Sequence, residues 1–410
     1  MTVALLHYAY PPVVGGVEFV MEQHTDLFAR NGYAVRIITG HGESALENVT
    51  IREIPELLPS HPLVVEAQEE IRKDPGHAPK FEALTDYFTK AFREAIEGCD
   101  AVIVHNVMMM HFNLAATTAI ARLAEENTGE VRFINWIHDL AAINPDYDFG
   151  PHLKSPPFRQ ITLLPKGMQS VIISKNRQRE LVKLTGASSR DCPVVPNGVE
   201  SIRLLRLTRD VRRFNRRFGI IYNEFVLIQP ARILRRKNVE YGIRVLAELR
   251  KLGHSAFYMV TGAPDPHHEA SREYGTELKK IVVEEGLERD FAFVSEYFPV
   301  SDTDLIGLYS ISDALFLPSK QEGFGLPLLE AGVFRLPTFC PRIEPMQSIL
   351  DHNVSLFDLD EPPAAVAKRL IRFLQADPGH LARKQVLQRY SWDLLFEKKI
   401  QPLLKKERKP

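Results

Sequence analysis

The sequence predicts an α/β protein made of two doubly wound domains, each with a parallel sheet covered by helices. Three observations lead to this prediction: the length of 410 residues, the alternation of short β-branched segments with helical patterns, and a change in composition near the middle of the chain. A chain of this length is too long for one ordinary core and fits two domains of about 200 residues each. Alternating strand and helix patterns are typical of βαβ crossovers, which join parallel strands.

The first half of the chain contains a series of apolar segments that we expect to be strands. A helical pattern over residues 17–32, which Gly32 closes, follows the first of them. Residues 59–98 are long, charged and partly helical, and we interpret them as an insertion able to lie over a cleft. The expected strands of this half are 3–8, 35–40, 100–106, 131–139, 170–175 and 192–198.

A basic segment, residues 201–220, separates the two series, and we interpret it as a solvated linker with helical pieces. Helices such as 238–253 then separate the strands of the second half. The expected strands there are 225–232, 256–262, 291–297, 314–319, 336–341 and 354–358. We therefore expect a first domain over 1–200, a second over 201–385, and a C-terminal segment over 386–410 with an amphipathic helix at 391–406.

Bulk composition excludes several classes of protein. The formal net charge is −1, so the chain as a whole has no signature of nucleic-acid binding. Cys99, Cys192 and Cys340 are isolated, which predicts neither a disulfide framework nor a zinc site and favours a reducing cytosol. The N-terminus lacks the basic residues of a signal peptide, and no apolar run approaches the roughly 20 residues needed to span a bilayer. The expected localisation is cytoplasmic.

Polar motifs follow several of the expected strands, where open α/β sheets bind their ligands. In "YPPVVGGVE", Gly15 and Gly16 lie where strand turns to helix, and glycine there lets backbone N–H groups approach an anionic or polar ligand. A plain turn would use the same residues. In "IHDL", His138 ends a strand beside Asp139. A lone histidine is more often structural, but its place at a strand end favours a functional role.

The motif "ARILRRKN" brings cations together in the second half of the chain. Arg232 ends a strand and Lys237 opens the next helix. Two nearby cations repel each other unless an anion lies between them, and a diphosphate fits that place. The alternative, a solvated basic turn, applies best to Arg235 and Arg236.

The motif "EGFGLPLLEA" places two carboxylates around a strand-to-helix turn. Gly323 and Gly325 permit a tight turn whose N–H groups point at a ligand, and Pro327 suits the first helical turn. We expect Glu330 in that first turn, where the helix dipole alone would favour it. Glu322 precedes the glycines, so a helix-start role does not account for it. The two acids therefore indicate the hydroxyl-rich ends of a nucleotide sugar, with a diphosphate between them.

Together these motifs resemble the retaining glycosyltransferases of family 4, the glycosyl transferases group 1. "EGFGLPLLEA" is similar to that family's glutamate, seven residues, glutamate motif, and "ARILRRKN" to its "GRLxxxKG" turn. "VVPNGVE" and "YPPVVGGVE" resemble its "xxNGVD" segment and its glycine loop. The resemblance spans nearly the whole chain. It implies the GT-B architecture: two Rossmann-like domains facing a cleft, with the acceptor mostly on the first, the nucleotide sugar mostly on the second, and a C-terminal helix crossing back to the first.

The resemblance also implies roles for single residues. Arg232 and Lys237 hold the diphosphate, Glu322 binds the donor sugar near its C3 and C4 hydroxyls, and Glu330 holds the ribose. His138 contacts the donor sugar beside the anomeric carbon. The implied catalytic residues are therefore His138, Arg232, Lys237 and Glu322.

Backbone groups complete the implied donor site. Phe324, Gly325 and Leu326 offer N–H contacts to sugar or phosphate, while Gly16, with Gly15 in the same loop, approaches the phosphate from the opposite domain. The implied acceptor contacts in the first domain are Tyr10, Asn106, Asp139 and Tyr147.

The implied reaction moves a hexose from a nucleoside-diphosphate sugar to a hydroxyl of a small polar acceptor: a sugar, a sugar phosphate or a glycerate-type solute. The anomeric configuration is retained, the leaving diphosphate accepts the acceptor's proton, and no metal or cofactor is required. Positioning and charge stabilisation then supply the catalysis. Nucleotide, sugar, acceptor, linkage and oligomeric state stay open. A lipid- or polysaccharide-directed transferase, a phosphorylase or epimerase of the same fold, and a non-catalytic two-lobed binding protein are the alternatives.

Two positions depart from the family pattern. An alanine replaces the usual glycine before Arg232, and Asn238 replaces the usual glycine after Lys237. The loop over 260–271 is also longer than in the family. We expect its residues Asp265, His267 and His268 to form a polar surface loop rather than a metal site.

Overall fold

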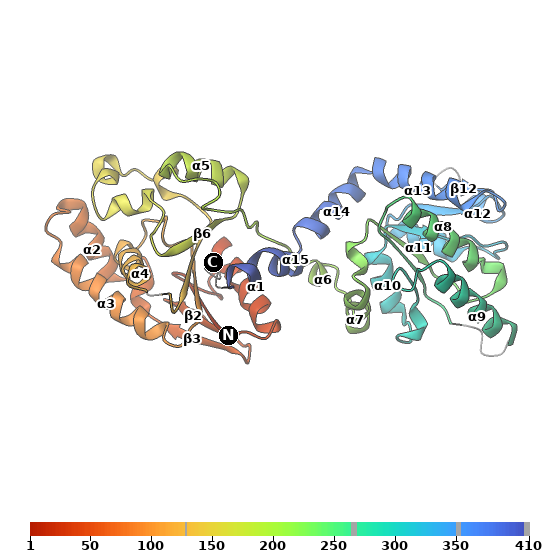
Figure 1. Cartoon of the computed structure of the whole chain (residues 1–410), viewed down its shortest axis with the longest axis horizontal. Helices are drawn as coiled ribbons and strands as arrows, with labels where there is room; N and C mark the ends of the chain where they lie inside the picture. Colours follow the sequence, from red (N-terminus) through yellow and green to blue (C-terminus); the bar gives the residue numbers. More distant parts are fainter. Residues whose placement is uncertain (128, 264–268, 350–353, 406–410) are drawn as a thin grey trace. The chain divides into compact units, whose positions relative to one another are not determined.

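The computed structural model describes residues 1–127, 129–263, 269–349 and 354–405. The chain divides into two compact units (Figure 1). Unit 1 contains residues 1–198 and the C-terminal segment from Trp392, and unit 2 contains Val199–Ser391. Each unit is built around a six-stranded, fully parallel sheet, so the predicted pair of Rossmann-like domains is confirmed.

The sheet of unit 1 has the strand order β3-β2-β1-β4-β5-β6. The order reverses between β1 and β4, and the carboxyl ends of these two strands are where such sheets bind ligands. Residues along β1 alternate between two hydrophobic clusters, as expected for a sheet covered on both faces. The strands are β1 (Thr2–Leu6), β2 (Ala34–Thr39), β3 (Val49–Glu53), β4 (Ala101–His105), β5 (Arg132–Ile137) and β6 (Met168–Ile172).

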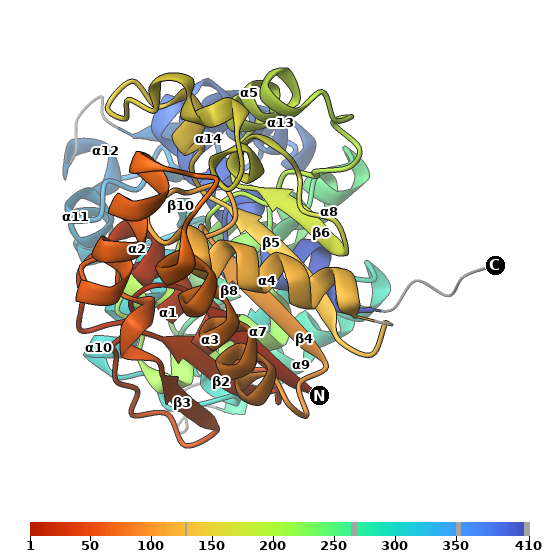
Figure 2. The same ribbon diagram turned by 90° about the vertical axis from the view of Figure 1, so that its left-hand side faces the viewer.

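Helices cover both faces of this sheet. One face packs against α1 (Gly16–Arg30) and the C-terminal elements α15 (Trp392–Leu395), the π-helix η8 (Phe396–Ile400) and α16 (Gln401–Leu403). The other face packs against α3 and α4, which lie side by side in Figure 2, and against α2. The remaining helices of the unit are α2 (Pro62–Lys73), α3 (Pro79–Ala95), α4 (Leu114–Glu126) and α5 (Lys175–Thr185).

Two expectations for the first half are wrong. Residues 59–98 are not an insertion over a cleft, because α3 buries Phe81, Phe88 and Phe92 in the core of unit 1 and α2 buries Ile71 there. The expected strand over 192–198 is reduced to one isolated bridge between Val194 and Ile172. The sixth strand is instead β3, an edge strand that only β2 pairs.

The sheet of unit 2 repeats the same winding, with the order β12-β11-β10-β7-β8-β9 and its reversal between β7 and β10. All six strands expected in this half are present, although most end earlier than the apolar pattern does. They are β7 (Phe225–Gln229), β8 (Ala256–Val260), β9 (Phe291–Phe293), β10 (Ala314–Phe316), β11 (Thr338–Pro341) and β12 (Ser355–Phe357).

The expected linker over 201–220 is also corrected. It forms two helices of unit 2, and Val211 and Phe214 lie in its core. The helices of unit 2 are α6 (Ser201–Leu204), α7 (Arg209–Phe218), α8 (Val239–Lys251), α9 (Glu269–Glu284), α10 (Asp302–Ile311), α11 (Leu326–Val333), α12 (Met346–Ile349), α13 (Pro363–Ala376) and α14 (Pro378–Arg389). Short 3-10 helices of both units are η1 (Pro55–Leu57), η2 (Ala141–Ile143), η3 (Gly150–Lys154), η4 (Phe158–Thr162), η5 (Ile220–Tyr222), η6 (Arg235–Lys237) and η7 (Val294–Glu296).

Two further expectations bear on the class of protein. All three cysteines are buried and free. Within the described ranges, no helix has the length and apolarity needed to cross a bilayer.

Candidate active site

The strongest polar cluster of unit 2 lies after β7 and β10, at the reversal of strand order. Lys237 Nζ lies 2.5 Å from Glu322 Oε1, and the two side chains are only 13% and 8% exposed. The hydroxyl of Ser319, a fully buried residue just after β10, donates to the same carboxylate oxygen at 2.7 Å. The lysine and the glutamate of two separate motifs are thus brought into one ion pair.

Buried polar residues hold the backbone of Lys237 in place. The side chain of Gln229, at the end of β7, donates from Nε2 to the Lys237 carbonyl at 2.8 Å. The Tyr258 hydroxyl donates to Gln229 Oε1, and burial raises the pKa of Tyr258 well above its usual value. Asn238 follows in the left-handed region with φ +54°, which asparagine tolerates better than most residues. This explains how Asn238 replaces the glycine usual in the family.

The glycine turn leads into α11. Gly325 is its N-cap with φ +95°, a conformation that other residues rarely adopt. Pro327 lies in the first turn, as predicted. In the part of the chain that the structure describes, the N–H groups of residues 323–326 have no hydrogen-bond acceptor. Phe324 and Leu326 are exposed, so these N–H groups are available to an anionic or hydroxyl-rich ligand.

Glu330 lies on α11, but in its second turn, so its expected place in the first turn is wrong. The Tyr309 hydroxyl donates to Glu330 Oε2 at 2.6 Å. Burial first, and then this carboxylate, raise the pKa of Tyr309. Glu330 is therefore held by a hydrogen bond, which neither the helix-start interpretation nor the motif predicted.

Arg232 lies in the exposed turn after β7. A Cβ at Gly262 would lie 2.3 Å from the Ala231 carbonyl oxygen and 2.7 Å from Arg232 Cα, so glycine is required for this close packing of two loops. The Gly262 N–H also donates to the Ala231 carbonyl at 3.1 Å. Gly262 thus fixes the turn that carries Arg232.

In unit 1 the glycine loop opens α1, with Gly15 as its extended N-cap and Gly16 as its first residue. The space around a Cβ at Gly16 is empty, whereas the Glu18 carboxylate lies over Gly15. Glu18 Oε1 also lies 3.7 Å from His7 Nε2, and a hydrogen bond from His7 lowers the pKa of Glu18. An acid therefore already lies close to this helix N-terminus.

His138 and Asp139 follow β5 and are held by Asn106, which follows β4. The Asn106 side-chain oxygen accepts from the His138 N–H at 3.1 Å and the Asp139 N–H at 2.8 Å. Asn106 is itself left-handed, with φ +51°. Asp139 Oδ1 lies 3.0 Å from Arg177 NH2 on α5. Three predicted residues, Asn106, His138 and Asp139, are thus gathered at one edge of the sheet.

A buried histidine cluster, His7, His24, His105 and His138, continues inward from this edge. His105 Nδ1 lies 3.3 Å from His138 Nε2, and His7 Nδ1 lies 2.7 Å from the His105 carbonyl. His24 packs edge-on against Trp136 with ring centroids 4.6 Å apart. Burial lowers the pKa of His24 and of His138 to about 3, and that of His105 well below its usual value. These three rings are therefore neutral at physiological pH.

Two of the expected acceptor contacts, Tyr10 and Tyr147, make packing contacts. Tyr10 is 2% exposed and packs in the core beside α1, and burial raises its pKa. Tyr147 packs edge-on against His111 with ring centroids 4.5 Å apart, in an aromatic group that also contains Phe112. The structure thus gives Tyr10 a packing role and places Tyr147 in an aromatic group.

No group of three or more potential metal ligands occurs among the residues that the structure describes. The loop residues Asp265, His267 and His268 lie outside the described residues.

Sequence reasoning missed the residues that hold the site: Ser319, Gln229, Tyr309, His105 and Arg177. Ser319 and His105 had a usable signal, because each is a polar residue at the carboxyl end of an apolar strand. Tyr309 had none, since it lies in the middle of a helical pattern.

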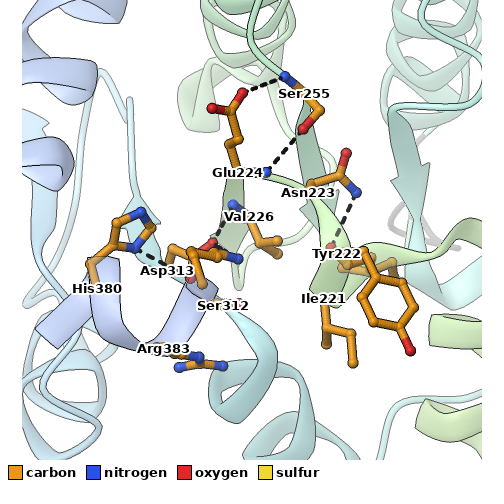
Figure 3. A network of polar contacts seen from close by, with 12 residues as sticks. Ile221, Tyr222, Asn223, Glu224, Val226, Ser255, Ser312, Asp313, His380 and Arg383 are labelled. Carbon is orange, nitrogen blue, oxygen red and sulfur yellow. Dashed lines mark hydrogen bonds and ion pairs between the residues drawn. The ribbon is translucent and has the colours of Figure 1, made fainter. Parts of the chain in front are cut away.

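A second polar network lies at the opposite, amino edge of the unit 2 sheet (Figure 3). Asp313, just before β10, accepts from the Val226 N–H at 2.8 Å and lies 2.6 Å from Lys384 Nζ on α14. His380 Nδ1 lies 3.6 Å from the other oxygen of Asp313. Because ligands bind at the carboxyl edge, we assign this network to fixing α14 on the sheet.

The paired parallel sheets, with polar residues at their switch points, define an α/β protein of the Rossmann-like class. Residues 210–388 match the family model of the glycosyl transferases group 1. The chain therefore contains a glycosyl transferases group 1 domain, which runs from α7 to α14.

Two sequence relatives agree with this assignment. An uncharacterized glycosyltransferase of Methanocaldococcus jannaschii, MJ1607, is 23% identical over 98% of this chain and 97% of its own length. The mannosylglucosylglycerate synthase of Petrotoga mobilis is 26% identical over 62% of this chain and 64% of its own length. The structure of Anabaena Alr3699/HepE with UDP and glucose is 16% identical, with a TM-score of 0.36 and 98% of each chain covered. The sequence relatives support a glycosyltransferase of the group 1 type.

Proposed function

We propose that this protein is a retaining glycosyltransferase that moves a hexose from a nucleoside-diphosphate sugar to a hydroxyl of a small polar acceptor. One observation carries the proposal: the Lys237–Glu322 pair lies beside the unpaired N–H groups of residues 323–326, at the switch point of a group 1 domain. A cation, a carboxylate and backbone donors in one place suit a diphosphate joined to a sugar.

Each group has a proposed task in unit 2. Lys237 and Arg232 hold the diphosphate and stabilise the charge that develops on it as the glycosidic bond breaks. Glu322, held by Ser319, accepts hydrogen bonds from sugar hydroxyls, and Glu330, held by Tyr309, accepts them from the ribose. Phe324, Gly325 and Leu326 contribute N–H donors.

In unit 1, we propose that His138 contacts the donor sugar and that Gly15 and Gly16 approach the phosphate. His138 is neutral at physiological pH because burial lowers its pKa, so it acts as a hydrogen-bonding group rather than as a charge. Asp139 and Asn106 stay proposed acceptor contacts, with Asn106 acting through the backbone of His138. The acceptor's proton passes to the leaving diphosphate, so no protein nucleophile, metal or cofactor takes part.

The similarity to a mannosylglucosylglycerate synthase supports a small, hydroxylated, acidic acceptor of the glycerate type. The absence of basic residues from most of α1 supports the same choice over a lipid, since Arg30 is its single lysine or arginine.

A thermal-shift screen of UDP-, GDP- and ADP-sugars tests the donor, because a ligand that binds the folded state raises the midpoint with log concentration. We expect one nucleotide class to raise the midpoint, and turnover with that donor and a small acceptor to survive EDTA. Donor binding without turnover on any acceptor would favour the binding-protein alternative. A rate that vanishes with EDTA and returns with magnesium would contradict metal independence.

A further inference from the structure

Seven arginines and no lysine lie between residues 203 and 217, with Asp210 as the single acid in that span. The formal net charge of the whole chain is −1, so this segment is strongly basic within a nearly neutral protein. All seven side chains are exposed. We call this surface the arginine face: Arg203, Arg206, Arg209, Arg212, Arg213, Arg216 and Arg217.

The fold presents these arginines on a fixed surface rather than on a loose linker. Val211, Phe214 and Asn215 form the buried side of α7, so the helical period directs its five arginines to the opposite side. The Thr208 hydroxyl caps α7 and also donates to Asp304 on α10 at 2.5 Å. Gly307 of α10 lies close to Val211, so α10 packs directly against α7.

The charge of the arginine face is not neutralised by the protein. In the described ranges, none of the seven arginines has a carboxylate within 4 Å, whereas other exposed basic residues such as Arg235 and Arg93 do. Like charges spaced three and four residues apart destabilise a helix. No ion pair in the described ranges therefore offsets the charge of the α7 arginines, and an external anion is the partner that would neutralise it.

The type of side chain indicates which anion. Arginine offers a planar fork of donors that matches phosphate oxygens, which lysine does not. Leu204, between two of the arginines, is 72% exposed, and Ile306 on the neighbouring helix α10 is 54% exposed. Nucleic-acid surfaces present free aromatic rings for stacking, but here Arg217 already covers Phe218 and Tyr297. Phosphate-binding forks beside exposed aliphatic side chains suit the headgroup region of a bilayer.

We propose that the arginine face docks unit 2 onto an anionic phospholipid surface. The contact is peripheral and electrostatic, with Leu204 reaching the boundary between headgroups and acyl chains. It requires no assumption about the donor or the acceptor, so it stands or fails separately from the proposed reaction.

Sedimentation of the full chain with vesicles tests this proposal. We expect binding to vesicles of equal phosphatidylcholine and phosphatidylglycerol at low salt (about 50 mM), and release at about 500 mM, because screening shortens the reach of surface charge. Pure phosphatidylcholine vesicles should not bind. The triple variant Arg209→Gln, Arg213→Gln, Arg216→Gln should bind about a hundredfold more weakly, since each basic residue near the surface contributes several-fold.

Two further variants sharpen the test. The triple variant Arg244→Gln, Lys368→Gln, Arg372→Gln removes the same charge from exposed positions of α8 and α13 and should bind as the wild type does. Leu204→Ser should weaken vesicle binding without changing charge. In the described structure, none of the side chains substituted in the three variants makes a hydrogen bond or ion pair. The variants should therefore keep the fold, and circular dichroism checks this.

Several results would overturn the proposal. They are no binding to phosphatidylglycerol vesicles, equal binding to pure phosphatidylcholine, or equal loss in the two triple variants. Tighter binding of a single-stranded RNA than of the vesicles, unaffected by Leu204→Ser, would assign the face to nucleic acid instead.

Discussion

At the scale of single residues, the candidate site of unit 2 depends on how Lys237 and Glu322 hold each other. The two side chains are almost fully buried, and a buried charge without a partner would lower the free energy of unfolding. Ser319 gives Glu322 a second hydrogen bond, so the carboxylate keeps a partner if Lys237 binds a phosphate as proposed. The ion pair therefore holds both side chains in place at the carboxyl edge of the sheet.

The first prediction concerns Lys237→Ala. Removing one cationic donor from a developing diphosphate charge should lower kcat/KM by roughly 100- to 1000-fold. The melting temperature of unit 2 should also fall by a few degrees, because Glu322 keeps only Ser319. Steady-state kinetics and calorimetry measure the two effects. Arg235→Ala is the matched control: it removes an exposed neighbouring cation that pairs with Glu277, and activity should stay within a few-fold. Similar activity in both variants would remove Lys237 from the site.

The second prediction separates the two glutamates. Glu330→Gln should weaken binding of both the nucleotide sugar and the free nucleoside diphosphate, since both contain the ribose. Glu322→Gln should weaken binding of the nucleotide sugar alone and lower kcat, because the proposed role of Glu322 is to orient the reacting ring. Each lost charged hydrogen bond should cost roughly 1.5–3 kcal/mol of binding free energy. Isothermal titration of both variants with both ligands is the measurement.

Tyr309→Phe is the control for Glu330. It removes the hydrogen bond that holds the carboxylate but keeps the carboxylate itself, so it should weaken nucleoside diphosphate binding less than Glu330→Gln does. If the two variants lose the same affinity, Glu330 acts mainly through Tyr309 and the ribose assignment is wrong.

The motifs predicted the charged residues of the candidate site but not the residues that hold them. Lys237 and Glu322 were predictable because their motifs follow apolar strands. Gln229 and Tyr258 were not predictable as site residues, since both lie inside apolar strand patterns that indicate the hydrophobic core. From the sequence, Asn238 was a departure from the family pattern. In the structure its backbone is left-handed, so asparagine is a conservative replacement for glycine there.

At the scale of elements, burial decided which strands the sequence could predict. Strands covered on both faces, such as β4 and β7, are continuous apolar runs and were found. The edge strand β3 reads "VTIRE" with no fully buried residue, so hydrophobicity gave no signal for it. The segment 192–198 is apolar because Cys192 and Val195 are buried, but it makes only a single bridge.

The third prediction concerns the element that ties α14 to the sheet. Asp313→Asn leaves the Lys384 ammonium, whose pKa burial already lowers, without its carboxylate. The free energy of unfolding of unit 2 should fall by about 3 kcal/mol, as expected when a buried ion pair loses one partner. Activity at low temperature should be unchanged, because Asp313 lies at the amino edge of the sheet. Urea unfolding followed by circular dichroism measures the loss.

Its control is an exposed ion pair of the same unit. Lys251→Ala, which breaks the contacts with Glu248 and Glu285, should leave unfolding close to that of the wild type. Equal destabilisation by both variants would mean that the Asp313 network has no special role.

At the scale of the whole molecule, the tryptophans and the buried histidine cluster both belong to unit 1. Both tryptophans of the chain, Trp136 and Trp392, lie in unit 1, and both pack against His24. Trp392 comes from the C-terminal segment, so that segment and the central sheet share one histidine-rich core. Tryptophan fluorescence therefore reports on the folding of unit 1 alone.

The last prediction is that unit 1 loses stability as the pH falls from about 6.5 toward 3. An exposed histidine in the unfolded chain has a pKa of about 6.5. In the folded unit, burial lowers the pKa of His24 and His138 to about 3 and that of His105 well below its usual value. Below pH 6.5 the unfolded chain therefore binds protons that the folded unit does not. The stability present above pH 6.5 is lost by about 1.4 kcal/mol per pH unit for each such histidine.

Urea unfolding followed by tryptophan fluorescence between pH 6.5 and 5 measures this dependence, in a range where most carboxylates stay ionised. His24→Phe keeps an aromatic ring among Phe28 and the two tryptophans but removes one titrating group. Its slope of unfolding free energy against pH should be smaller than the wild-type slope by about 1.4 kcal/mol per unit. Whatever its stability at neutral pH, an unchanged slope would show that His24 already takes up a proton in the folded state.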